Sequence, residues 1–327
     1  MPEVTLAITA IPNSGKTTLF NRLIGANQTV GNWPGVSVEK KVGRLQLNGF
    51  HVQLVDLPGA YSITPGSLEE EIVRDYFLGS PPHLILNVVE AGNLYRGLGM
   101  TLQLSTSGIP MVLAVNMMDE ARRQGIQINF TAFSKHLGIP VVPLVARTGE
   151  GVTELKRVLL EFLQGKGVYR PPLISLPPVL EKAITDLSRQ IEGQDGYAPL
   201  DASFVAVRLL EGGEAASRLV RRQPSLQPVL RRAGTKRTWV EKILGTDVVT
   251  TCAQCRFNAA RGLVREVTKT PKVISTTLTE KIDNVLMHRL IGLPLFFLIM
   301  FLLFQGVFAL GTPLQELIGA GIGSLQA

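Results

Sequence analysis

Residues 10–17 have the types and spacing of a loop that binds phosphate. They read Ala10-Ile11-Pro12-Asn13-Ser14-Gly15-Lys16-Thr17, which follows the pattern G-x-x-x-x-G-K-[ST] except that alanine stands at the first glycine. In such a loop, backbone N–H groups and a helix N-terminus point at phosphate, the lysine reaches the β- and γ-phosphates, and the threonine hydroxyl can bind Mg²⁺. A plain strand-to-helix turn is the alternative, and this stretch alone does not decide between the two.

A second candidate site is Asp56-Leu57-Pro58-Gly59, at the end of an apolar run. An acid in this place can hold Mg²⁺ through water, and a glycine three residues later can bring its N–H to a γ-phosphate. The alternative is an ordinary turn, since Asp, Pro and Gly all favour turns. The position, one crossover after the phosphate loop, favours the functional interpretation.

A third candidate site, Asn116-Met117-Met118-Asp119, distinguishes guanine from adenine. A carboxylate here can accept hydrogen bonds from the N1–H and N2–H₂ groups of guanine, and adenine has no such pair of donors. A helix cap by Asp119 is the alternative. The motif therefore indicates GTP rather than ATP.

Two weaker segments complete the set. Val145-Ala146-Arg147 follows a later apolar run, where a backbone N–H could meet guanine O6. The segment from Gly31 to Glu39 is rich in turn formers, so it could close over a γ-phosphate and lend the Ser37 hydroxyl to Mg²⁺. No single site is specific, and the order in which all five occur is the evidence.

The elements between these sites predict an α/β P-loop GTPase domain over residues 1–166. Apolar runs begin near residues 4, 43, 52, 84, 111 and 141, and helical patterns at 68–78, 99–107 and 130–138 lie between them. Most of the runs are near-continuously apolar, as in parallel strands buried on both faces. We therefore expect a mostly parallel sheet with crossover helices and each candidate site at the end of a strand.

Beyond this domain the strand signal disappears. A linker with several prolines occupies 167–178, a small all-α domain is predicted over 179–268, and a juxtamembrane segment over 269–289. Residues 290–311 carry no charge and would span roughly 33 Å as a helix, so they predict a transmembrane helix, with a buried soluble helix as the alternative. Residues 312–327 are expected to be an apolar tail cut short by truncation.

Charge predicts the orientation and the partners. Basic residues cluster before residue 290, so the positive-inside rule puts residues 1–289 in the cytoplasm. The net charge of +7 comes without interleaved aromatic residues or a nucleic-acid module, so no nucleic-acid partner is expected. Cys252 and Cys255 are interpreted as ordinary thiols, and no histidine is assigned to a metal.

Taken together, NSGKTT, GNWPGVSVE, DLPGAYSITP and NMMDEA resemble the cytoplasmic part of the FeoB family of prokaryotic ferrous-iron transporters. The resemblance implies a GTPase domain, a helical domain that acts as a GDP-dissociation-inhibitor-like spacer, and a first membrane helix. It implies a GTP-binding and slowly hydrolysing regulatory module whose nucleotide state gates Fe²⁺ uptake. The implied location is a bacterial inner membrane. Implied partners are that membrane, a transport domain that this chain lacks, small cytoplasmic Feo accessory proteins and further copies of the chain.

The resemblance also implies roles for individual residues, with GTP or GDP, Mg²⁺ and K⁺ as the bound species. Catalysis would depend on Asn13, Lys16, Ser37 and Gly59. The nucleotide would be bound by Ala10, Asn13, Ser14, Gly15, Lys16, Thr17, Thr18, Gly35, Ser37, Asp56, Pro58, Gly59, Asn116, Met117, Asp119, Val145, Ala146 and Arg147. Mg²⁺ would be held by Thr17, Ser37 and Asp56, and K⁺ by Asn13.

The chain departs from the family pattern at Ala10 and Ile11, at Ser37, where threonine is usual, and at Val145, where serine is usual. Because the Val145 side chain cannot donate or accept a hydrogen bond, we expect a looser guanine loop. Ala60 stands where Ras-type enzymes have a water-positioning glutamine, so hydrolysis is expected to be slow and K⁺-stimulated. Two alternatives stay open: a GTP sensor with negligible hydrolysis, and a membrane-tethered Era-like GTPase unrelated to iron.

Overall fold

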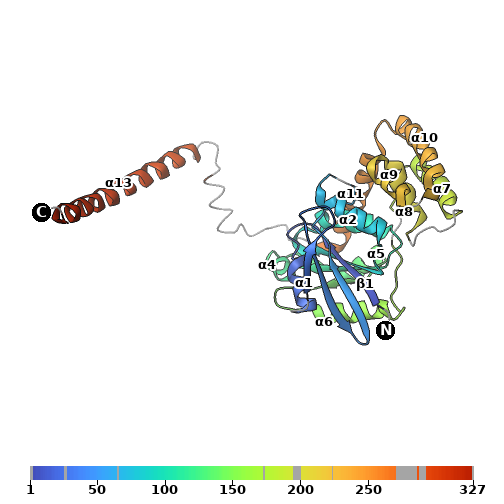
Figure 1. Cartoon of the computed structure of the whole chain (residues 1–327), viewed down its shortest axis with the longest axis horizontal. Helices are drawn as coiled ribbons and strands as arrows, with labels where there is room; N and C mark the ends of the chain where they lie inside the picture. Colours follow the sequence, from blue (N-terminus) through green and yellow to red (C-terminus); the bar gives the residue numbers. More distant parts are fainter. Residues whose placement is uncertain are drawn as a thin grey trace. The chain divides into compact units, whose positions relative to one another are not determined.

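The structure is a computed structural model. It describes residues 3–25, 28–64, 66–171, 174–193, 200–222, 224–269, 286 and 292–325. Residues 1–271 form one compact unit and residues 272–327 form a second. The first unit contains a sheet, the helices that cover it and a group of further helices (Figure 1).

In the described part of the first unit, the main sheet has seven strands in the order β2-β3-β4-β1-β5-β6-β8. These are β1 (Glu3–Ala10), β2 (Gln28–Asn32), β3 (Glu39–Leu47), β4 (Phe50–Asp56), β5 (Leu84–Glu90), β6 (Met111–Asn116) and β8 (Val141–Pro143). Strands β4, β1, β5, β6 and β8 run parallel, whereas β3 pairs antiparallel with β4 on one side and with β2 on the other. The predicted α/β domain with a mostly parallel sheet is confirmed.

Helices cover both faces of this sheet. They are α1 (Lys16–Ile24), α2 (Leu68–Gly79), α3 (Leu94–Ser105), α4 (Met118–Arg123), α5 (Phe130–Leu137) and α6 (Val152–Leu163), with a short 3₁₀ turn at Ala91–Asn93. Because side chains alternate along a strand, Leu6 and Ile8 pack with α1 and α6, whereas Ala7 packs with α2, α3 and α5. Strand β1 is therefore buried on both faces, as its apolar sequence predicts.

A group of helices follows the linker, as predicted for the second domain. They are α7 (Pro178–Glu192), α8 (Ala202–Glu211), α9 (Gly213–Arg222), α10 (Gln227–Leu244) and α11 (Val248–Val267), with a 3₁₀ turn at Pro224–Leu226. Helices α10 and α11 are separate because Gly245 takes a left-handed φ of 69° and Asp247 caps α11 by accepting from the Thr250 N–H. Figure 1 shows α7, α8, α9 and α10 gathered to one side of the sheet.

The linker is attached to the first domain at two points. The Tyr169 hydroxyl donates to Ser105 O at 2.6 Å, and burial raises the pKa of Tyr169 above its ordinary value. One residue later, the Arg170 N–H donates to Gly138 O at 2.8 Å. A side chain at Gly138 would place its Cβ 1.6 Å from Arg170 O, so this contact depends on glycine. The start of the helical domain is thus held against the sheet domain.

Three strands of the described residues, β2, β7 (Gln127–Ile128) and β9 (Thr268–Lys269), were not predicted. The edge strand β2 escapes detection because all of its side chains are exposed and it contains Gly31 and Asn32, which disfavour strands. The two-residue strand β9 follows α11 and pairs antiparallel with β7. Such a short pair is made by backbone groups and leaves no side-chain pattern to detect. The chain therefore returns to the sheet domain after the helices.

The predicted transmembrane helix at 290–311 overlaps α13 (Gly292–Leu325), which belongs to the second unit. Residues 290 and 291, and most of the predicted juxtamembrane segment, lie outside the described residues. Within the part of the chain that the structure describes, no helix is long and apolar enough to cross a membrane.

Candidate nucleotide-binding site

The phosphate loop joins the end of β1 to the start of α1. Asn13 and Gly15 both have left-handed backbone, with φ of 66° and 80°. The Ser14 hydroxyl donates to Ile11 O at 2.9 Å and closes the turn. A Cβ at Gly15 would lie 2.2 Å from Asn116 Nδ2, so this glycine is required by both its φ and its surroundings.

Ala10, at the position of the missing first glycine, is fully buried in β1. It is not among the residues with positive φ, and its carbonyl accepts a hydrogen bond from the Ala60 N–H at 3.0 Å. An extended backbone accommodates a methyl group without strain. The replacement of this glycine by alanine therefore leaves the loop geometry available.

The charged centre of the site is an ion pair between Lys16 and Asp56. Lys16 begins α1, and Asp56 ends β4, the strand next to β1, so parallel neighbours bring the two together. Burial raises the pKa of Asp56 above its ordinary value, and Lys16 opposes this shift. The groups predicted to meet phosphate and Mg²⁺ thus lie side by side and neutralise each other.

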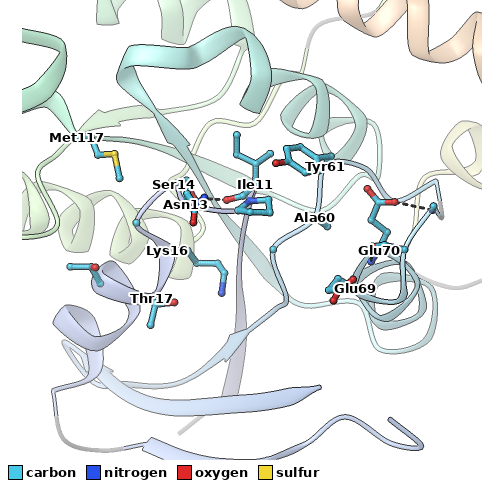
Figure 2. Close-up of a pocket in the computed structure, with 16 residues that line it drawn as sticks. Ile11, Asn13, Ser14, Lys16, Thr17, Ala60, Tyr61, Glu69, Glu70 and Met117 are labelled. Atoms are coloured by element: carbon cyan, nitrogen blue, oxygen red, sulfur yellow. Dashed lines mark hydrogen bonds between the residues drawn. The ribbon is translucent and has the colours of Figure 1, made fainter. Parts of the chain in front are cut away.

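A cavity of about 870 Å³ opens beside this pair (Figure 2). Of the predicted site residues, its lining includes Asn13, Ser14, Gly15, Lys16, Thr17, Thr18, Gly59 and Met117. In Figure 2, Lys16 and Thr17 lie on one side of the cavity, and Glu69 and Glu70 lie on the other. The structure therefore brings together the phosphate loop and Gly59, the last residue of the second motif, around one cavity, whose lining does not include Asp56.

The cavity also has lining residues that were not predicted as site residues: Ile11, Pro12, Ala60, Tyr61, Gly66, Ser67, Glu69 and Glu70. Some of them form the start of α2. The Ser67 hydroxyl accepts from the Glu70 N–H at 3.3 Å, and Glu70 Oε2 accepts from the Gly66 N–H at 2.8 Å. Ser67 thus caps α2 as in a capping box, whereas Glu70 reaches one residue further back than the N-cap; the sequence S-x-x-E at 67–70 could have revealed this helix start.

On the base side, the Asn116 amide connects two loops. Its Nδ2 donates to Ser14 O and its Oδ1 accepts from the Ala146 N–H, each at 2.9 Å. The phosphate loop and the guanine loop (residues 145–150) are therefore held together by one side chain. The Ala146 N–H, one of the candidates for guanine O6, is engaged by this contact.

Asp119, the predicted reader of guanine, is paired with two arginines. Arg147 and Arg123 approach its Oδ2 at 3.2 and 3.3 Å. The hydrogen bond from Arg147 is the main cause that lowers the pKa of Asp119 below its ordinary value. The carboxylate is thus kept ionised and accepting, which is the state that guanine recognition requires.

The segment around Ser37 is placed differently from the expectation. Neither Gly35 nor Ser37 lines the cavity, and Ser37 is exposed. Trp33 instead packs edge-to-face on Tyr76 of α2, with ring centroids 5.7 Å apart, and Lys40 lies over the Trp33 ring. Pro58 also lies outside the lining. In this structure the Ser37 hydroxyl is therefore not assembled with Thr17 and Asp56.

Buried polar side chains hold the loop that follows Gly59. Gln103 of α3 is 2% exposed, and its Oε1 accepts from the Ile63 N–H at 3.0 Å and from the Ser62 hydroxyl at 2.9 Å. Its Nε2 donates to Thr64 Oγ1 at 3.0 Å. Arg208 of α8, paired with Glu211 at 2.8 Å, donates to the same Thr64 oxygen at 3.3 Å. This loop is thus bound by both domains.

Comparisons with known proteins agree with this geometry. The family described as Ferrous iron transport protein B matches residues 4–159, and the FeoB cytosolic helical domain matches residues 177–269. An Fe(2+) transporter FeoB from Escherichia coli (strain K12) is 34% identical over 332 residues. A Porphyromonas gingivalis protein, a fusion of Fe(2+) transport protein A with Fe(2+) transporter FeoB, is 37% identical over 325 residues.

These alignments cover 98% of this chain but only 40% and 38% of the two relatives, so the chain spans about two-fifths of their length. Solved structures match more completely. The cytosolic domain of L. pneumophila FeoB is 32% identical, with a TM-score of 0.66, over 81% of this chain and 100% of that chain. A GDP-bound variant of the S. thermophilus FeoB G domain has the same identity and coverage, with a TM-score of 0.69.

The motifs, the mostly parallel sheet with its phosphate loop, the helical domain and the relatives all agree. The chain contains a G domain and the helical cytosolic domain that follows it. It belongs to the FeoB family of ferrous iron transport proteins.

Proposed function

We propose that this chain binds GTP with Mg²⁺, hydrolyses it slowly, and serves as the regulatory module of a ferrous-iron transporter. The observation that carries the proposal is the ion pair of Lys16 with Asp56 at the phosphate loop, where Lys16 and Thr17 line a cavity of about 870 Å³. That volume lies within the usual range of ~300–1,000 Å³ for small-molecule sites. GDP-bound and GMPPNP-bound structures of related FeoB cytosolic domains add support.

The residues present fit a magnesium nucleotide. Hydroxyl and carboxylate oxygens are the ligands that Mg²⁺ prefers, and Thr17 and Asp56 would supply them. Lys16 would exchange its bond with Asp56 for the β- and γ-phosphates, which would free the carboxylate for the metal's water shell. Ser37 would have to move into the cavity, so we infer that nucleotide binding reorders the segment 31–39.

Slow hydrolysis is inferred from the residues near the γ-phosphate position. Ala60 lines the cavity with a methyl group and cannot orient water. Asn13 also lines the cavity, where its amide would help hold K⁺. A cation beside the phosphates supplies stabilisation of the developing negative charge, so we expect hydrolysis to be stimulated by K⁺.

We infer that the nucleotide state is relayed through Thr64. This residue follows the Gly59 motif by a few positions and accepts hydrogen bonds from both Gln103 and Arg208. A shift of the loop would therefore reach α8 and the helical domain. From there it would gate Fe²⁺ passage through a transport region of the kind that the longer relatives would contain outside the aligned part.

A membrane location in bacteria, contact with small accessory proteins and self-association belong to this proposal. The fused Fe(2+) transport protein A of the P. gingivalis relative supports the accessory partner.

Single-turnover GTP hydrolysis, measured in K⁺ and in Na⁺ at equal ionic strength, tests the enzyme proposal. We expect a slow rate that rises in K⁺, and Asn13→Ala should remove the difference between the two salts. GTP binding without hydrolysis in either salt would favour the sensor alternative. Limited proteolysis near residues 31–39 tests the reordering, which is refuted if a non-hydrolysable GTP analogue with Mg²⁺ leaves cleavage unchanged.

A further inference from the structure

Arg22 of α1 contacts a loop that lies far along the chain. Its Nε donates to Ala146 O at 3.3 Å, and its Nη2 donates to Arg147 O. Both acceptors are backbone carbonyls of the guanine loop. The guanidinium of Arg22, on the helix that begins at the phosphate loop, is therefore bound to the backbone that is expected to face the base.

These two contacts also fix the direction of the N–H group in each of the two peptides. In a planar trans peptide, the C=O and N–H groups point in opposite directions, and the described residues include no cis peptide. The Ala146 carbonyl points at Arg22, so the N–H of Arg147 points away from it. The hydrogen bond to the next carbonyl fixes the following peptide in the same manner.

The neighbouring N–H groups already have acceptors. The Ala146 N–H donates to Asn116 Oδ1 at 2.9 Å, and the Thr148 N–H donates to Val145 O at 3.2 Å. Within the described residues, the Arg147 N–H has no protein acceptor. It is thus the donor that this part of the loop keeps available for a ligand.

We propose that Arg22 is a positioning residue for guanine recognition, which holds the Ala146–Arg147 peptide so that the Arg147 N–H meets O6 of the base. This inference rests on the proposed GTP binding and refines it. It also explains how the loop keeps its shape with Val145, whose side chain makes no hydrogen bond. Asp119 reads the N1–H and N2–H₂ groups, so Arg22 and Asp119 act on different atoms of the same base.

The test compares three nucleotides on the whole chain with Mg²⁺. In 6-thio-GTP a sulfur, a weaker acceptor, replaces O6 while both donors to Asp119 remain, and ITP keeps O6 but lacks the N2 amino group. We expect Arg22→Ala to weaken GTP binding about tenfold, as for the loss of hydrogen bonds from a charged group. Binding of 6-thio-GTP should weaken less, so its affinity ratio to GTP should approach one. The ratio of GTP affinity to ITP affinity in Arg22→Ala should stay within about twofold of its value in the unchanged chain.

Two further variants separate positioning from a general structural effect. Arg22→Lys retains one donor position and should recover part of the preference for O6. Arg44→Ala removes an exposed arginine from β3 and should change neither ratio. Thermal unfolding of each variant without nucleotide checks that the fold is kept.

Three results would overturn the inference. Full GTP affinity and unchanged ratios in Arg22→Ala would show that the contacts do not matter for the base. A parallel change in both ratios would show that Arg22 only supports the loop as a whole. If the unchanged chain bound GTP no better than ATP, the proposed function itself would fail, and the inference with it.

Discussion

Replacing Gln103 by leucine should release the loop that follows the Gly59 motif. Leucine has nearly the same volume, so the change removes hydrogen bonds without opening a large cavity. Ile63 is 1% exposed, and its N–H would be left buried without the acceptor that now lies at 3.0 Å. A buried donor left unpaired costs about 1–3 kcal/mol. Thr64 would keep its bond from Arg208, and the partly buried Ser62 hydroxyl could turn to water.

Adding the lost bonds to Ser62 and Thr64, we expect Gln103→Leu to lower the free energy of unfolding by about 2–3 kcal/mol. The substitution should also make local opening of the loop at residues 62–64 more frequent. Hydrogen exchange of the Ile63 amide should accelerate about 30- to 100-fold, since each 1.4 kcal/mol is a factor of ten. Urea unfolding and hydrogen exchange with mass spectrometry measure the two effects.

Gln46→Leu is the matched control, because Gln46 is exposed on β3 and the same substitution there removes no buried contact. Its urea midpoint and its exchange at 62–64 should equal those of the unchanged chain. If Gln103→Leu behaves like this control, Gln103 does not hold the loop. The proposed relay through Thr64 would then rest on Arg208 alone.

Three further predictions concern the nucleotide site. Gly15→Ala should weaken GTP binding at least about 100-fold in equilibrium titration, because its Cβ would lie 2.2 Å from Asn116 Nδ2 at a φ of 80°; binding within tenfold would contradict the assigned geometry. Ala10→Gly should leave GTP affinity equal or slightly higher, since Ala10 lacks a positive φ, and a clear loss of affinity would refute this. Burial raises the pKa of Asp56, so its carboxylate takes up a proton at a higher pH than an exposed aspartate does. The enhancement of GTP affinity by Mg²⁺ should therefore fall as pH is lowered through that raised pKa, and the stability linked to protonated Asp56 should be lost as pH rises through it; an enhancement independent of pH, measured by titration across the acid range, would contradict the assignment.

Much of the fold could be predicted because its signals are local. Each buried parallel strand is a short apolar run, and the phosphate loop, Asp56 and Asp119 each follow such a run directly. The carboxyl ends of neighbouring parallel strands meet at one edge of a sheet, so order along the chain was enough to bring Lys16 and Asp56 together. The helix cap at Ser67 has an equally local signal in the sequence S-x-x-E at 67–70.

The rest of the site depends on contacts between residues that are far apart in sequence. Gln103 binds a backbone N–H 40 residues away, Arg22 a carbonyl 124 residues away, and Arg208 a hydroxyl 144 residues away. A single glutamine or arginine on a helix has no pattern that names its partner. Such residues can be identified only after the chain has been folded in space. The placement of Ser37 outside the cavity has the same origin, because the packing of Trp33 on Tyr76 decides it.

The pairing of β9 with β7 determines where mechanical force would enter the first unit. The last described residue of that unit, Lys269, pairs with Gln127, and the Asn129 N–H donates to Val267 O at 2.8 Å. Gln127 follows, by a few positions, the helix that carries Asp119. Tension on the chain beyond Lys269 would thus load this strand pair, and with it the neighbourhood of α4, where Asp119 is proposed to read guanine, before it stretched the bundle of α7 to α10.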